Sequence, residues 1–227
     1  MAVSSRGVRA AVVLPVALLV LGGWVILVVV RNHGSAPSFA AMWLAMSVAM
    51  MIPTAFRPMM RAAQGSASGA WRFVAGFVGV WIIAGPATYL VMNAVEWTTA
   101  WIAAAWVLAG AYQLTPLMQR NLTTCRSIRF AGRPTGYGMR QGLRCVASCW
   151  PLMLAVMVTV MALPGTVLPM VALIGVTALL CWEKQPGLAP RAIAAVGMAM
   201  LLVAAGGAVL LGGGGGSIHH STGTSTS

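Results

Sequence analysis

The amino-acid sequence predicts an all-α fold: a polytopic transmembrane helix bundle with about seven spans. Hydrophobic residues make up 59% of the 227 positions, charged residues make up only 7%, and the mean hydropathy is +0.88. A water-soluble domain of average composition carries about 25% charged residues, so this chain lacks the polar surface that such a domain needs. Uncharged apolar stretches of about 20 residues recur, which is the length that an α-helix needs to cross a bilayer. We expect helices because an isolated strand would leave backbone groups unpaired in lipid.

Seven apolar stretches follow one another along the chain. The first follows Arg6 and Arg9 and is too long for the hydrophobic part of a signal peptide, so we interpret it as a retained anchor. The fifth and sixth are separated by Pro164 and Gly165, which predict a tight turn and an antiparallel hairpin. We expect one bundle over residues 1–211, followed by a flexible Gly-, Ser- and Thr-rich tail at 212–227. The seven predicted spans are residues 10–30, 39–56, 71–93, 98–118, 145–163, 166–182 and 191–211.

The basic residues are distributed unevenly between the two sides of the predicted bundle. Of the 14 Lys and Arg residues, all but Arg31 fall in loops on one side. The positive-inside rule then places the N-terminus in the cytoplasm and the C-terminus outside, in a bacterial inner membrane. Because these residues lie between apolar spans, the expected partner is the lipid bilayer and not nucleic acid. The residues on the basic side are Arg6, Arg9, Arg57, Arg61, Arg72, Arg120, Arg126, Arg129, Arg133, Arg140, Arg144, Lys184 and Arg191.

All four cysteines fall near the predicted cytoplasmic face. Cys125 follows the fourth span, Cys145 and Cys149 begin the fifth, and Cys181 ends the sixth. Residues four apart share one face of a helix, so Cys145 and Cys149 can present two thiolates to one ion. A reducing cytoplasm disfavours a structural disulfide. The alternative interpretation is that the cysteines are small buried hydrophobic residues.

Methionines extend the spacing of the cysteines. Thioethers and thiolates together select Cu(I) among the common metals, so a sulfur stripe that starts at a thiol pair suggests a copper route. The alternative is that the methionines are flexible packing residues between helices. The predicted ligands are Cys125, Cys145, Cys149, Met153 and Met157, with Cys181, Met42, Met46 and Met50 as further candidates.

Glu183 and Lys184 stand at the inner end of the sixth span, opposite an arginine-rich segment. We expect a structural ion pair between Glu183 and Arg126, with an oxygen ligand near the cysteines as the alternative role for Glu183. Motifs of hydrolases and nucleotide-binding enzymes, such as HExxH, GxSxG and Walker A, are absent, and the sequence contains no Asp. We therefore expect a protein without catalytic activity of its own.

Several short motifs occur in an order that resembles a known family. The second span contains a methionine-rich segment at 41–53, and residues 110–117 read Gly-Ala-Tyr-Gln-Leu-Thr-Pro-Leu. Cys125-Arg126, Cys149-Trp150 and Glu183-Lys184 follow in order. On these motifs, residues 38–186 resemble the bacterial predicted metal-binding integral membrane proteins, a family without an established function. The resemblance implies a helical membrane fold and a role in metal handling. Members of that family tend to carry paired cysteines before the tryptophan, where this chain has Ser148 and Cys149.

Three hypotheses of function follow. The first is a non-enzymatic membrane protein that binds or delivers a metal, most simply copper as Cu(I). The second is an accessory subunit of a larger membrane complex, such as a copper-dependent membrane monooxygenase, with other membrane subunits as partners. The third is a thiol-redox enzyme with a reversible Cys145–Cys149 disulfide, which the geometry of two residues four apart on a rigid helix disfavours.

Overall fold

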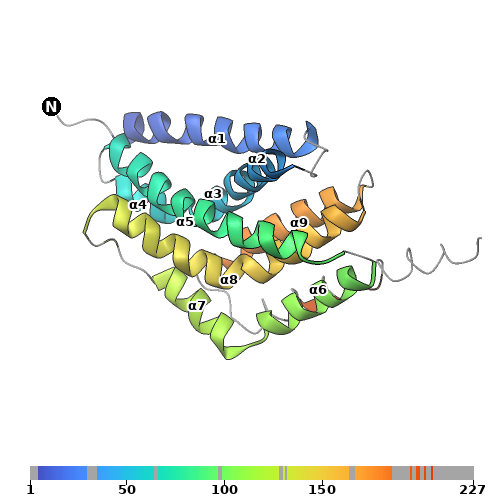
Figure 1. The fold of residues 1–227 in the computed structure, drawn as a ribbon. Helices are drawn as coiled ribbons and strands as arrows, with labels where there is room; N and C mark the ends of the chain where they lie inside the picture. The colour runs from blue at the N-terminus through green and yellow to red at the C-terminus, as the bar shows by residue number, and fades with distance from the viewer. Residues whose placement is uncertain are drawn as a thin grey trace, which may run out of the picture.

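The computed structural model describes residues 5–185, except for 30–34, 64–65, 97–98, 128–129, 131 and 164–166, together with isolated positions beyond 185. Every regular element within these residues is helical, which confirms the predicted all-α class (Figure 1). The predicted span at 191–211 is described only at isolated helical positions. The tail at 212–227 lies outside the described residues.

Four helical segments in the described part of the chain are long and apolar enough to cross a bilayer. They coincide with the first, second, third and fifth predicted spans. The second of them is a composite of α2 (Ala36–Met46), the π-helix η1 (Ser47–Met51) and α3 (Ile52–Thr54). The other three are α1 (Ser5–Val29), α5 (Ala67–Asn93) and α8 (Pro134–Ala162).

The fourth predicted span, at 98–118, is not one straight helix. α6 (Thr99–Gln113) and α7 (Pro116–Ser127) form a pair bent by 65° at a short break. Pro116 has no N–H to continue the first helix. The Thr115 hydroxyl donates to the Tyr112 carbonyl at 2.7 Å and accepts from the Met118 N–H at 3.2 Å, so it caps the second helix. The expected straight span is therefore corrected to a broken one, which adds a fifth crossing if the pair is counted together.

The fifth and sixth predicted spans differ from the observed helices in length. α8 begins at Pro134, eleven residues before the predicted start at Cys145, because proline is favoured in the first helical turn. Arg140 and Arg144 therefore lie on a helix instead of in a loop. α9 (Leu168–Glu183) has 16 residues and is about 24 Å long, shorter than the hydrocarbon core of about 30 Å.

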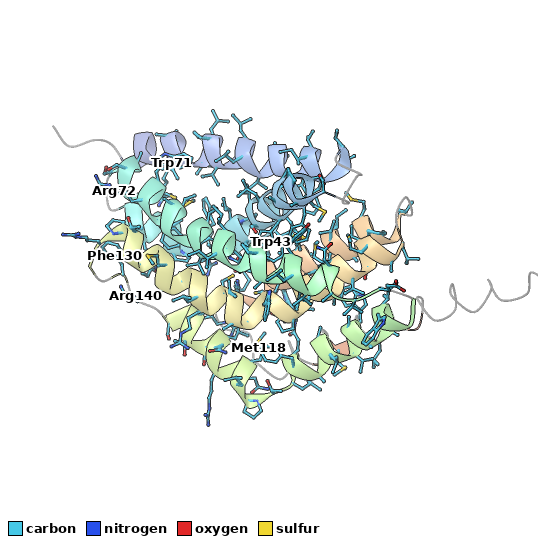
Figure 2. The ribbon with its side chains drawn as sticks, in the orientation of Figure 1. Trp43, Trp71, Arg72, Met118, Phe130 and Arg140 are labelled. Atoms are coloured by element: carbon cyan, nitrogen blue, oxygen red, sulfur yellow. The ribbon has the colours of Figure 1, made fainter. Side chains whose placement is uncertain are left out.

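α5 and α8 run side by side through the centre of the molecule, with α1 and α2 on one side and α6 and α7 on the other (Figure 1). Their backbones approach closely at glycines: a Cβ atom on Gly138 would lie 2.2 Å from the Phe73 carbonyl oxygen, and one on Gly76 would lie 2.2 Å from that of Thr135. Small residues at helix contacts are typical of membrane bundles. Arg72 near the start of α5 and Arg140 near the start of α8 lie toward the same end of the pair (Figure 2).

Candidate metal centre

Cys145 and Cys149 lie on the face of α8 that points into the core. Both side chains are fully buried, and their Sγ atoms are 4.0 Å apart. Both thiols are free, and so is that of every other cysteine in the chain. The four-residue spacing produces this pair directly, because each turn of helix places the second thiol above the first.

A third sulfur completes the group. The Met51 Sδ atom lies 3.8 Å from the Cys145 Sγ atom and belongs to η1, which packs opposite α8. We call Met51, Cys145 and Cys149 the three-sulfur cluster. The four-residue spacing of Met42, Met46 and Met50 points to Met50 and not to Met51. The spacing fails here because a π-helix holds one more residue between hydrogen-bonded groups than an α-helix does.

Pro53 is the sequence feature that indicates this shift from Met50 to Met51. A proline inside a helix removes one N–H donor and disturbs the hydrogen-bond ladder in the turn that precedes it. The π-helix occupies that turn and ends two residues before Pro53. A π-helical turn of this kind is frequent at functional sites.

An ammonium group faces the cluster. Lys184 follows the last residue of α9, and its Nζ atom donates to the Cys145 Sγ atom at 2.9 Å and to the Thr54 hydroxyl at 3.1 Å. Burial alone lowers the pKa of Lys184, but the neighbouring thiol groups of Cys145, Cys149 and Cys125 outweigh it, and the net pKa lies well above the ordinary value. The lysine therefore stays charged beside the sulfurs.

Ser148 supports the same group of atoms. Its hydroxyl lies 3.4 Å from the Cys149 Sγ atom and donates to the Cys145 carbonyl at 3.1 Å. A hydroxyl thus occupies the place where the resembled family tends to carry another cysteine.

The other two cysteines stand apart from the three-sulfur cluster. Cys125 is buried on α7, where its Sγ atom accepts from the Gln141 Nε2 atom at 3.0 Å. Cys181 is half-buried on α9. The geometry thus brings Cys145 and Cys149 together, whereas Cys125 lines a cavity that it shares with Lys184.

The predicted methionine ligands are all part of the hydrophobic core. Met153 and Met157 are fully buried on α8, and the three methionines of the second span are buried on α2 and η1. Metal binding by these methionines stays a prediction, because flexible methionine side chains also fill space between packed helices.

Arg126 and Glu183 are in contact, but through the backbone. The Arg126 guanidinium donates to the backbone carbonyl of Glu183, at the C-terminus of α9, where carbonyl groups lack helical partners. Both carboxylate oxygens of Glu183 are buried without a hydrogen-bond partner among the described residues. The ion pair between the two side chains stays a prediction.

The two sulfur–sulfur separations that start from Cys145 match those around a three-coordinate soft metal ion. With metal–sulfur bonds of about 2.3 Å, an ion in the plane of three sulfurs requires them to be about 4.0 Å apart. The two measured separations in the three-sulfur cluster are 4.0 and 3.8 Å. Among the described residues, no group of three His, Cys, Asp or Glu side chains could hold a metal, so a site here needs the thioether.

Comparison with known proteins places this chain in a family. Residues 40–208 match the family described as PpoB2, copper chaperone. This match covers well over half of the chain and includes the whole three-sulfur cluster. No curated protein and no solved structure matches the chain. The chain therefore belongs to the PpoB2 copper chaperone family.

Proposed function

We propose that this protein is an integral membrane copper chaperone that binds one Cu(I) ion at the three-sulfur cluster and passes it on. The observation that carries the proposal is the pair of sulfur–sulfur separations, 4.0 Å between Cys145 and Cys149 and 3.8 Å between Cys145 and Met51. Both distances are those expected between sulfurs that share one three-coordinate ion.

The ligand chemistry favours Cu(I) over the other common metals. Two thiolates and a thioether are soft ligands, and soft ligands select Cu(I). Structural Zn²⁺ sites are almost always four-coordinate, with Cys, His or carboxylate ligands. The Lys184 ammonium lies 2.9 Å from the Cys145 Sγ atom, and a charged ammonium cannot supply a fourth ligand.

Lys184 also stabilises a buried thiolate at Cys145. A buried anion is costly unless a partner compensates its charge. The ammonium lies 2.9 Å from the Cys145 Sγ atom, and a neighbouring cation is the usual means by which proteins keep a thiolate reactive. The cluster is thus prepared to bind a metal ion before one arrives.

The test is a competition titration of the purified protein with Cu(I) and a coloured Cu(I) chelator, in detergent and without oxygen. The expected result is one tightly held Cu(I) per chain and its loss in the Cys145→Ser/Cys149→Ser variant. Cys181→Ser serves as the matched control, because this half-buried thiol stands outside the cluster. Substoichiometric copper in the wild type, or unchanged copper in the double variant, contradicts the proposal.

Delivery also requires a recipient. Membership of a copper chaperone family supports a copper-dependent membrane enzyme, such as a monooxygenase, as the partner, with this chain as an accessory protein. Gentle detergent extraction followed by native mass spectrometry tests this second proposal. A partner subunit that co-purifies with the chain is the expected result, and a lone monomer under all extraction conditions contradicts it.

A further inference from the structure

A basic cavity lies beside the three-sulfur cluster. It is lined by side chains from α3, α4, α7, α8 and the end of α9, and the space in it that a water molecule can occupy measures about 70 Å³. Four of the lining side chains are cationic: Arg57, Arg61, Arg126 and Lys184. None of the lining residues is acidic. A space of this size admits only the end of a ligand, while Arg57 and Arg61 are exposed at the rim, where their charge favours an anion.

Gln141 gives the cavity a specific recognition group. Its side chain is 4% exposed, lines the cavity and donates from Nε2 to the Cys125 Sγ atom at 3.0 Å. Its other terminal atom, Oε1, is buried and has no hydrogen-bond donor among the described residues. A buried acceptor without a donor is unfavourable, so a ligand with an N–H group would be stabilised here.

The cavity is connected to the metal centre through two of its own lining residues. Cys125 contributes a thiol to the wall, and Lys184 contributes the ammonium whose Nζ atom lies 2.9 Å from the Cys145 Sγ atom. An ion held at the Cys125 thiol would therefore share the cavity with the ammonium that contacts the three-sulfur cluster.

We propose that this cavity docks the carrier that brings copper: a small anionic peptide thiol that holds Cu(I) through its sulfur. The carboxylates of the carrier would face Arg57 and Arg61, an amide N–H would reach the Gln141 Oε1 atom, and the Cu(I)–thiolate group would meet Cys125. This inference deepens the proposed function and rests on it.

The transfer is a ligand exchange without redox chemistry. Bonds between Cu(I) and two carrier thiolates break, and bonds from Cu(I) to the sulfurs of Cys145 and Cys149 form, with Cys125 as the intermediate ligand. Cys149 loses one thiol proton, which passes to one departing carrier thiolate, and the second carrier sulfur leaves as a thiolate because Cys145 enters the exchange as a thiolate. Copper remains Cu(I), and the charge on both sides of the exchange is the same.

The experiment measures the rate of copper loading from two donors at the same free Cu(I) concentration: Cu(I)–glutathione, which carries carboxylates, and Cu(I)–2-mercaptoethanol, which does not. The test variant is Arg57→Gln/Arg61→Gln. The matched control is Arg72→Gln/Arg120→Gln, which removes the same charge from exposed arginines on the same predicted side that do not line the cavity. S-methylglutathione, an anion without a free thiol, serves as a competitor, with inorganic phosphate at equal ionic strength beside it.

The expected result is loading from Cu(I)–glutathione that is about tenfold slower in the test variant, within the range of electrostatic steering, with loading from Cu(I)–2-mercaptoethanol unchanged. S-methylglutathione should slow the first donor only, and more strongly than phosphate does. Equal rates in the test and control variants, equal slowing from both donors, or equal inhibition by phosphate would overturn the inference. Failure of the wild type to bind Cu(I) from either donor would overturn the proposed function instead.

Discussion

Met50 and Met51 are adjacent and fully buried, and Met51 is the one that contacts Cys145. Leucine is close to methionine in volume, so Met51→Leu should preserve packing and remove one metal ligand. We expect X-ray absorption of the copper-loaded variant to show two sulfur neighbours in place of three, with Cu(I) affinity lower by about tenfold or more. Met50→Leu is the matched control. Three sulfur neighbours in both variants would show that the third ligand is another methionine.

We expect Lys184 to set the pH range in which the three-sulfur cluster binds copper. Copper binding displaces thiol protons, so loading weakens as pH falls. Because the pKa of Lys184 lies above its ordinary value, the ammonium is charged throughout the physiological range and favours loading there. In Lys184→Met we expect the midpoint of copper loading to move to higher pH and the affinity at neutral pH to fall by about a hundredfold, since a buried thiolate loses its partner.

The Lys184 prediction is checked by chelator competition at a series of pH values. Lys184→Arg keeps the positive charge and should retain most of the affinity. A loading curve for Lys184→Met that superimposes on that of the wild type would assign the lysine a purely structural role.

Sequence spacing was sufficient for one part of the site and insufficient for the rest. Cys145 and Cys149 are close because a regular helix places residues four apart on one face. Met51, Thr54 and Lys184 come from segments far away in the chain, and their positions depend on a π-helical turn and on the packing of α9 against η1 and α3. Local periodicity contains no information about such contacts between distant segments. Pro53 marks where the helical spacing of the second span changes.

At the scale of elements, the close contact of α5 and α8 positions the cluster. An alanine Cβ at Gly138 would lie 2.2 Å from the Phe73 carbonyl oxygen, which belongs to a backbone that cannot turn aside. We expect Gly138→Ala to lower the free energy of unfolding by about 1–3 kcal/mol and to lower the melting temperature in detergent. The matched control is Gly136→Ala, because nothing lies within 4 Å of a Cβ there. Equal melting temperatures for the two variants would contradict this packing.

The helices that the sequence predicted best are the long apolar ones. Their existence follows from hydropathy alone, because about 20 apolar residues in a row have few stable alternatives in lipid. The break between α6 and α7 depends on Thr115 and Pro116, whose effect is local and does not alter hydropathy. The start of α8 was missed because its first turns carry arginines and glycines, which lower the hydropathy without preventing a helix.

At the scale of the whole molecule, the basic residues predict which end of the bundle faces the cytoplasm. Green fluorescent protein fused after Ala63 should fluoresce, and alkaline phosphatase fused after Ala94 should be active, because these positions precede and follow α5, which is long and apolar enough to cross a bilayer. The reciprocal fusions, phosphatase after Ala63 and fluorescent protein after Ala94, are the controls and should be inactive. The opposite pattern would reverse the proposed direction of copper entry.

We expect the Lys184 ammonium also to influence which charge the bound metal ion can carry. Two thiolates, one ammonium and a monovalent ion add up to zero net charge in a buried site. A divalent ion at the same position would leave one uncompensated positive charge, which costs about 3 kcal/mol or more and corresponds to about a hundredfold in affinity. We therefore expect the site to disfavour Zn²⁺ and Cu²⁺ by charge as well as by ligand softness, and a single lysine to select the oxidation state of the bound metal.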